Sequence, residues 1–137
     1  MKEPRGIRND NPLNIRKGCA WAGMREVQTD PSFVQFKSMQ YGLRAGFRLM
    51  KNHITGFNGK RPKFNTIAKL ISVWAPPSEN ATNKYIDFVC QYAKMQPNDI
   101  ILETNQKQMC AIARAMAFVE NGIWIDEKII ESAWFLI

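Results

Sequence analysis

The sequence predicts a mainly α-helical domain of the α+β class, with a small lobe at residues 1–40 and about five helices at residues 41–137. Turn-forming residues dominate the first 40 positions, whereas apolar residues recur at helical spacing after them. A length of 137 residues with 45% hydrophobic residues is sufficient for one folded unit with a sizeable core. We therefore expect a single domain over residues 1–137.

The N-terminal lobe is predicted from its turn residues. Asn-Pro at positions 11–12 and Asp-Pro at positions 30–31 interrupt the chain, and glycines lie between them. The segment Phe-Val-Gln-Phe at 33–36 fits a short strand. We expect a small β-hairpin or an irregular lobe.

Two helices are expected in the middle of the chain. The first covers residues 41–56, where apolar side chains recur near every third or fourth position. Asn65 or Thr66 caps the second, because a short polar side chain can accept a free backbone N–H bond there. The Pro-Pro pair at 76–77 stops this second helix.

Three further helices are expected toward the C-terminus. Asn80 or Thr82 caps the third, and Thr104 opens the fourth. The fourth has a clear amphipathic stripe and breaks at Asn-Gly, positions 121–122. Asp126 caps a short fifth helix.

The charge is unevenly distributed. The chain has 19 basic and 12 acidic residues, a formal net charge of +7. Residues 1–63 carry 13 basic against 4 acidic residues, and residues 64–137 carry 6 against 8. A basic half favours a polyanionic partner: nucleic acid, an anionic membrane surface, or the bacterial wall with its acidic peptides and teichoic acids. Charge alone does not choose among them, and a solvated surface is the plainer interpretation.

Cysteine and histidine usage argues against several chemistries. Cys19, Cys90 and Cys110 are odd in number and lack a C-x-x-C spacing, so neither a disulfide framework nor a zinc site is predicted. His53 is the single histidine, which leaves no Ser-His-Asp, Cys-His or metal constellation. We expect no metal and no cofactor, and sugar chemistry rather than peptide chemistry.

Glu120 is the most informative acidic residue because it lies in the last turn of the predicted fourth helix. The negative end of the helix dipole disfavours its ionisation, and Phe118, Val119 and Trp124 could remove water from it, so a raised pKa is expected. A carboxyl group that stays protonated is what glycosidic bond cleavage needs, since the leaving oxygen must receive a proton. From its position in the sequence alone, Glu120 is more commonly interpreted as an exposed glutamate at a helix end, next to the glycine that caps the helix.

Four segments carry a family resemblance. AIARAMAFVENG at 111–122 resembles the helix that delivers the catalytic glutamate in lytic transglycosylases and lysozyme-like muramidases. RGIRNDNPLNIR at 5–16, DPSFVQFKSMQYGLRA at 30–45 and WAPPSENATNKYI at 74–86 are similar to one phage-encoded lysozyme-like family, often labelled a virion structural protein. Together these segments span residues 5–122.

The resemblance implies a lysozyme-like bundle with rearranged order. In the usual chain the glutamate helix comes first and the small lobe follows, whereas here the lobe comes first, as in a circular permutation. Folding would then bring Asn11 and Asn14 near Glu120. Asparagines brace turns and also bind sugar hydroxyl and acetamido groups, and both roles stay open for these two.

Other candidates for the site are less specific. Asp30 is the best second carboxylate, followed by Glu79, although aspartate before proline is a common turn residue. Glu79, Asn80 and Tyr85 could line a substrate cleft, with helix capping as the alternative for Asn80. Trp21 could stack on a sugar, whereas Trp74 is more typical of a core anchor.

These features predict a monomeric enzyme that cleaves peptidoglycan glycan strands between N-acetylmuramic acid and N-acetylglucosamine. Glu120 is the expected general acid, and hydrolysis and lytic transglycosylation both stay open. The alternative is a non-catalytic virion or wall-binding protein with the same fold. A nucleic-acid-binding domain is the weaker rival, because no helix-turn-helix or basic recognition helix is recognisable.

The expected location follows from the N-terminus. It has no apolar signal region, and no apolar run approaches 18 residues, so neither a signal peptide nor a transmembrane segment is predicted. We expect synthesis in the cytoplasm and action at the cell wall after phage-mediated or secretion-mediated delivery. The delivery machinery and any immunity or inhibitor protein are left open.

Overall fold

The computed structural model describes residues 3–77 and 81–137. This part of the chain is mainly helical, as predicted. Its antiparallel contacts are isolated bridges and not strands. The helices are α1 (Arg5–Arg8), α2 (Met39–Gly59), α3 (Ile67–Trp74), α4 (Thr82–Ala93), α5 (Gln106–Asn121) and α6 (Glu127–Trp134).

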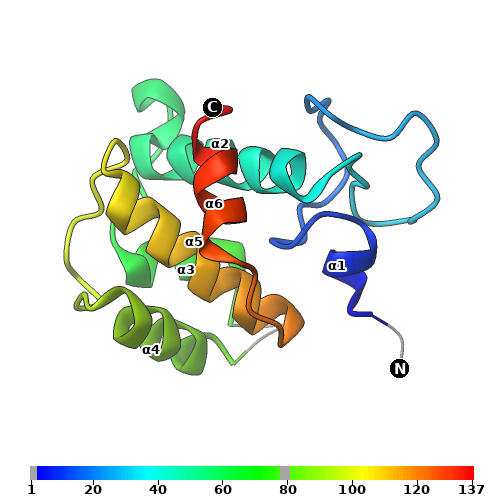
Figure 1. The fold of residues 1–137 in the computed structure, drawn as a ribbon. Coiled ribbons are helices and arrows are strands. Elements are labelled where there is room, and N and C mark those ends of the chain that lie inside the picture. The colour runs from blue at the N-terminus through cyan, green and yellow to red at the C-terminus, as the bar shows by residue number, and fades with distance from the viewer. Residues whose placement is uncertain (1–2, 78–80) are drawn as a thin grey trace.

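The helices pack around α5. It contacts α4 on one side and α6 on the other, while α6 also packs on α2, and α3 packs on α4. Figure 1 shows α2 and α4 on opposite sides of this group, with the N-terminal lobe and its short helix α1 beside the end of α5. The lobe therefore lies next to the C-terminal turn that carries Glu120.

Several helix boundaries agree with the sequence prediction. The Thr66 hydroxyl accepts from Lys69 N at the start of α3, and the Asp126 carboxylate accepts from Lys128 N at the start of α6. Helix α5 ends at Gly122, whose φ of 71° is the left-handed conformation that glycine tolerates best.

Other boundaries differ by a few residues. Ser38 caps α2, so this helix begins two residues before position 41. Three consecutive left-handed residues, 56–58, end its regular part where the end was predicted, although the helical range extends to Gly59. Asn105 caps α5 in place of Thr104.

The start of α4 also differs from the prediction. Its N-cap is Ala81, whose side chain makes no capping bond, and Thr82 lies in the first turn. The Thr82 hydroxyl donates to the Ala75 carbonyl instead and ties α4 to the end of α3. The alternative cap, Asn80, lies outside the described residues.

The expected strand at 33–36 is not formed, and the lobe is irregular. Isolated bridges join Arg16 to Phe33 and Met24 to Phe36. The backbone of Gln35 bonds to the Gln28 side chain, which accepts from Gln35 N at 2.7 Å and donates to Gln35 O at 2.8 Å. The Gln28 side-chain amide therefore occupies the backbone groups of Gln35 that a neighbouring strand would otherwise bind.

The core has two clusters. The larger lies between the helices and includes Leu43, Phe47, Ile71 and Met116, while the smaller lies under the lobe. The lobe approaches α2 at Gly42, where a Cβ atom would overlap the backbone carbonyl of Asp10. The small cluster consists of Ile15, Val34, Phe36 and Ala45.

None of the helices in the described ranges has the length and apolar character needed to cross a membrane.

Candidate active site

Glu120 lies at the meeting point of three segments. Its Oε1 atom accepts a hydrogen bond from Asn14 Nδ2 at 2.9 Å, and its Oε2 atom accepts one from the Tyr85 hydroxyl at 3.0 Å. Asn14 comes from the N-terminal lobe, Tyr85 from α4, and Glu120 from the last turn of α5. Both oxygens of this half-buried carboxyl group are therefore positioned by neutral side chains.

The turn that carries Asn14 is fixed to the helices residue by residue. Asn121 Nδ2 donates to the Pro12 carbonyl at 2.8 Å, and Trp74 Nε1 donates to the Leu13 carbonyl at 3.1 Å. Asn14 itself has φ +53°, a left-handed conformation that asparagine adopts more readily than most residues. The lobe thus docks beside Glu120 through directed hydrogen bonds.

Asn11 has the bracing role. Its side chain is fully buried, donates to the Ile15 and Val34 carbonyls, and accepts from Ile15 N at 2.9 Å. All of these bonds lie within the lobe. Of the two asparagines expected near Glu120, Asn14 contacts it, and Asn11 shapes the turn that presents Asn14.

A cavity of about 510 Å³ adjoins this carboxyl group. Asn14 and Glu120 lie in its wall together with Trp21 and Trp74. Trp74 also packs against the larger core cluster, so its core role and a place in the cavity wall are compatible. The two indole rings give the cavity apolar surface close to an acid.

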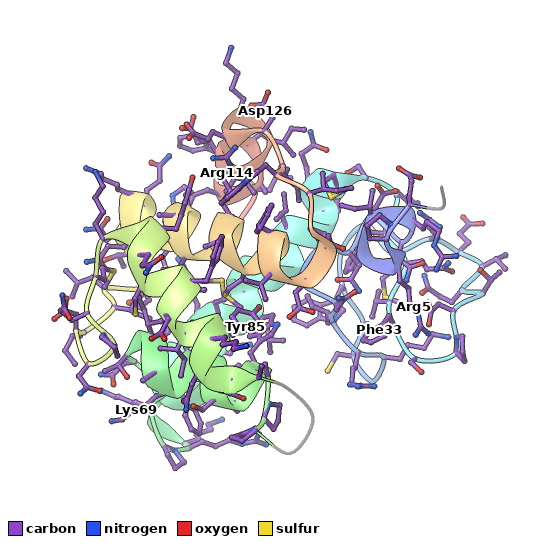
Figure 2. The ribbon with its side chains drawn as sticks, turned by 90° about the horizontal axis from the view of Figure 1, so that it is seen from below. Arg5, Phe33, Lys69, Tyr85, Arg114 and Asp126 are labelled. Atoms are coloured by element: carbon purple, nitrogen blue, oxygen red, sulfur yellow. The ribbon has the colours of Figure 1, made fainter. Side chains whose placement is uncertain are left out.

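Tyr85 is deeply buried at 5% exposure. Burial raises the pKa of its phenol well above the ordinary value, and the neighbouring Glu120 carboxylate raises it further. The hydroxyl also lies 3.5 Å from the Met116 carbonyl oxygen, a second acceptor. Figure 2 places Tyr85 between α4 and α5 in the interior of the molecule.

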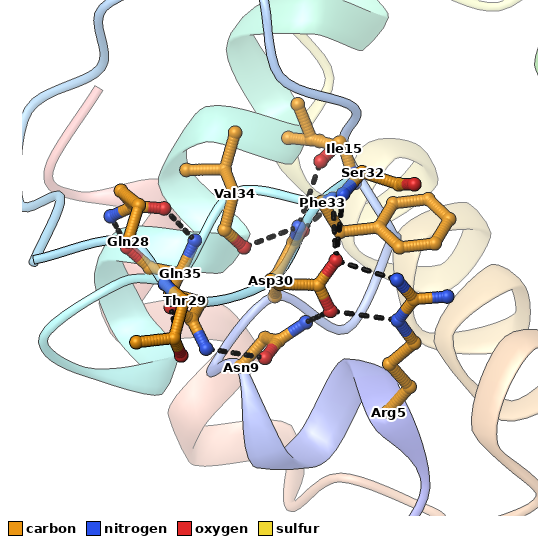
Figure 3. Close-up of polar contacts among 11 residues, drawn as sticks. Arg5, Asn9, Ile15, Gln28, Thr29, Asp30, Ser32, Phe33, Val34 and Gln35 are labelled. Atoms are coloured by element: carbon orange, nitrogen blue, oxygen red, sulfur yellow. Dashed lines mark hydrogen bonds and ion pairs between the residues drawn. The ribbon is translucent and has the colours of Figure 1, made fainter.

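Asp30 lies in the lobe in a separate polar network. Arg5 binds its carboxylate with two hydrogen bonds, Nε to Oδ2 at 2.7 Å and Nη2 to Oδ1 at 2.6 Å. Asn9 and the backbone N–H groups of Ser32 and Phe33 donate to the same carboxylate, as Figure 3 shows. Bonding to Arg5 is the main cause that holds the Asp30 pKa far below its usual range.

This placement revises the expected role of Asp30. It does not line the cavity beside Glu120, and an arginine, an amide and two backbone N–H groups occupy its oxygens. The Asp30 carboxylate therefore binds groups of the lobe itself and anchors its fold.

The residues expected to exclude water from Glu120 lie elsewhere. Phe118 and Trp124 stack on each other with ring centroids 4.3 Å apart, and Phe88 stacks on the same Phe118 ring. Trp124 is 42% exposed and Val119 is 37% exposed. None of the three lines the cavity, and the Phe118 ring instead stacks on Phe88 of α4.

Two predicted residues, Glu79 and Asn80, lie outside the described part of the chain.

The cavity also contains residues that the sequence did not single out as candidates. Arg16 and Lys17 form part of its wall, and so does His53. Burial, with a smaller effect of the Arg61 charge, lowers the pKa of His53. Arg16 could have been found from the sequence, because it ends the motif with Asn-Ile-Arg. No local pattern indicates that His53 lies in the same cavity wall.

The donor set for a metal is not assembled here. Within residues 3–77 and 81–137, no three His, Cys, Asp or Glu side chains come together in a way that could hold an ion.

Comparison with known proteins gives one relationship. No protein-family model matches the chain. Protein P5 of Pseudoalteromonas phage PM2 is 35% identical over 122 residues, which cover 86% of this chain and 71% of the relative. Identity at this level over most of both chains means that they share an ancestor, so the chain belongs to the family of phage Protein P5.

Proposed function

We propose that the protein cleaves the glycan strands of bacterial peptidoglycan between N-acetylmuramic acid and N-acetylglucosamine, with Glu120 as the general acid. One observation carries the proposal. The Glu120 carboxyl group is held between Asn14 and Tyr85 in the wall of a cavity that two tryptophans also line. The resemblance of four segments to lysozyme-like enzymes agrees with that arrangement.

The first chemical step is proton transfer to the leaving oxygen. As the bond between the anomeric carbon and this oxygen breaks, the protonated Glu120 gives its proton to the oxygen, and the sugar ring gains positive charge. The Tyr85 hydroxyl fits both states of the acid. It can donate to ionised Glu120, or accept from protonated Oε2 while donating to the Met116 carbonyl.

The second step needs a nucleophile and a base. Glu120, now ionised, accepts the proton of the attacking hydroxyl group. Inverting and retaining hydrolases use a second carboxylate, and among the described cavity residues Glu120 is the only carboxylate. We infer that the 6-hydroxyl of the muramic acid attacks its own anomeric carbon, which gives a 1,6-anhydro end and needs no second carboxylate.

Sugar binding is assigned to the aromatic and amide groups. Trp21 and Trp74 offer apolar surface for the faces of sugar rings, and Asn14 offers a polar group beside Glu120. A substrate strand held there would place its glycosidic oxygen at Glu120.

The same geometry supports a circularly permuted lysozyme-like fold. Helix α1 packs on α5, and Asn121 and Glu120 both bond to the turn at residues 12–14. The N-terminal lobe thus lies where a chain leaving the end of α5 would build its next segment.

The proposed place of action is the bacterial wall, reached in a phage particle or by secretion. Membership of a phage protein family supports that route. The net charge of +7 would hold a monomeric enzyme on an anionic wall.

The test compares wild-type protein with Glu120→Gln on purified sacculi. Glutamine keeps the size and can still accept from Asn14, while its amide nitrogen donates to the Tyr85 oxygen, but it has no acidic proton, so cleavage should fall by about a thousandfold. Mass spectrometry of the released muropeptides should find 1,6-anhydro ends. Glu131→Gln, which changes an exposed glutamate of α6, is the matched control and should cleave like wild type.

Three results would change the proposal. Equal cleavage by Glu120→Gln and wild type would remove Glu120 from the mechanism. Reducing ends in place of anhydro ends would replace the internal hydroxyl by water. Wild-type protein that sediments with sacculi but releases nothing would instead establish the non-catalytic wall-binding role.

A further inference from the structure

Two cationic side chains at the edge of the cavity lack a carboxylate partner among the described residues. Arg16 and Lys17 are both exposed and both line the cavity that contains Glu120. Glu120 is itself bonded to Asn14 and Tyr85. This edge of the cavity therefore carries positive charge, and the ion pairs of the described chain all involve other arginines: Arg5, Arg25 and Arg114.

Arg16 is positioned by an aromatic ring. The centre of its guanidinium group lies 5.0 Å from the centroid of Phe33, and that of Arg5 lies 4.6 Å from the same centroid. Such contacts fix a guanidinium plane while leaving its N–H groups free to bind. Figure 2 shows Arg5 and Phe33 together in the lobe.

The two arginines on this ring differ in one respect. Arg5 binds the Asp30 carboxylate with two hydrogen bonds, whereas Arg16 pairs with none of the described carboxylates. Both arginines therefore contact the Phe33 ring. Arg5 is already bound to a carboxylate, whereas the guanidinium of Arg16 is free to bind an anion in the cavity.

The backbone under these cations is also fixed. Arg16 forms an antiparallel bridge with Phe33, and Lys17 N donates to the Ser32 carbonyl at 2.9 Å. An anchored backbone lowers the entropy lost when a side chain binds a ligand. The edge is thus suited to bind a planar anion such as a carboxylate.

The chemistry of the proposed substrate supplies such an anion at one position. The glycan rings are neutral, but muramic acid carries a lactyl group that continues into a stem peptide with free carboxylates. We infer that Arg16, assisted by Lys17, binds a stem-peptide carboxylate, so that the protein selects peptide-bearing muramic acid over peptide-free glycan. This inference rests on the proposed function and adds a specificity site to it.

The experiment measures cleavage of two glycans that differ in the peptide. Sacculi free of teichoic acid are compared with the same sacculi after an amidase has removed their stem peptides and the lactyl carboxylates exposed by that hydrolysis have been converted to methyl amides. Wild type should have a higher kcat/KM on the peptide-bearing strands. Arg16→Gln should lower kcat/KM on these strands about tenfold more than on stripped strands, because a two-point charged contact to the peptide is lost.

Further variants sharpen the result. Arg16→Lys keeps the charge but not the planar fork, so it should retain part of the preference. Lys17→Gln should have a smaller effect than Arg16→Gln. Arg48→Gln removes an exposed arginine of α2 that does not line the cavity, and it should behave like wild type on both substrates.

A binding measurement separates this inference from the catalytic proposal. Glu120→Gln protein is titrated with a peptide-bearing tetrasaccharide and with the same tetrasaccharide whose lactyl groups end in uncharged methyl amides. Tighter binding of the former that disappears in Glu120→Gln/Arg16→Gln protein supports the inference even if wild type cleaves nothing.

Equal affinity for both tetrasaccharides would overturn it while leaving cleavage by Glu120 intact. A preference that appears only with walls that contain teichoic acid would also overturn it, because the phosphate would then be the bound anion.

Discussion

Asp30 and Glu120 are two carboxyl groups that both accept hydrogen bonds on both oxygens, yet their partners differ in kind. Asp30 is bound by a guanidinium, an amide and two backbone N–H groups, which only donate to it. Glu120 is bound by an amide and by a phenol, and the phenol can reverse its hydrogen bond. Asp30 accepts five hydrogen bonds and Glu120 accepts two, but it is the kind of partner that separates a structural carboxylate from the one proposed as the general acid.

What distinguishes them is whether a proton can be accommodated. A proton on Asp30 would face donors only and would break the pair with Arg5. A proton on Glu120 can point to the Tyr85 oxygen, and the Tyr85 proton has the Met116 carbonyl as an alternative acceptor. The comparison predicts that mutations at Asp30 change stability, whereas mutations around Glu120 change activity.

The largest of these effects is expected for Asp30→Asn. The substitution removes the charge from a nearly buried site, and Arg5, which is 42% exposed, loses its partner. We expect the free energy of unfolding to fall by about 2 kcal/mol, while the activity of the folded fraction stays at the wild-type level. Urea denaturation followed by circular dichroism measures the change.

Asp10→Asn is the control for that variant. Asp10 pairs with Arg25, and both side chains are about one-third exposed, so a loss below about 1 kcal/mol is expected. Equal losses for the two variants would mean that the Asp30 network does not anchor the lobe.

The stability difference between wild type and Asp30→Asn should depend on pH. Because the folded-state pKa of Asp30 is lowered, its contribution is complete above the ordinary aspartate pKa and is lost as the pH falls toward the folded value. The difference should be constant above about pH 5 and should shrink below about pH 4. Urea titrations at several pH values check this, and a difference that stays constant down to pH 3 would contradict the lowered pKa.

Tyr85→Phe addresses the other side of the comparison. Phenylalanine preserves the packing between α4 and α5 but removes the group that orients Glu120 and shares its proton. We expect about a tenfold lower kcat and a loss of about 1 kcal/mol in stability. Tyr92→Phe is the matched control, since the Tyr92 hydroxyl bonds to Arg114 outside the cavity. Full activity of Tyr85→Phe would show that the phenol is only a packing group.

The smallest expected effect is a stability difference that separates the role of the Asn14 amide group from that of its left-handed backbone. Asn14→Gly removes the amide but permits φ +53°, whereas Asn14→Ala removes the same amide and adds backbone strain. Both variants should lose activity alike, and the alanine variant should be less stable than the glycine variant by about 1 kcal/mol. Equal stabilities would mean that the turn at residues 12–14 relaxes when the amide is absent.

The parts of the fold that were predictable are those with local signals. Thr66, Asp126 and the Asn-Gly break at 121–122 mark helix ends through bonds to neighbouring residues, and each is where the sequence indicated. Helix α1 has four residues and no periodicity, so it was missed. The strand expected at 33–36 fails because the Gln28 side chain competes for its backbone groups.

The contacts within the site are not local, and the family resemblance, not a local signal, predicted that Asn14 lies near Glu120. Tyr85 and Asn14 were among the expected site residues, and both contact Glu120. Asp30 was expected in the site as the best second carboxylate of the lobe, and no local signal indicated that its carboxylate binds Arg5, which lies 25 positions away. Arg16 and His53 belong to the cavity through packing between distant segments, which no local pattern records.

The hydrogen bond between Asn14 and Glu120 joins residues that are 106 positions apart. A ribosome has therefore made nearly all of the described chain before the acid meets its first partner. No fragment that stops short of α5 can contain the assembled site, however well its own helices form. Under the proposed function, the general acid would therefore lack its hydrogen-bond partners until α5 has been synthesised and has packed against the N-terminal lobe.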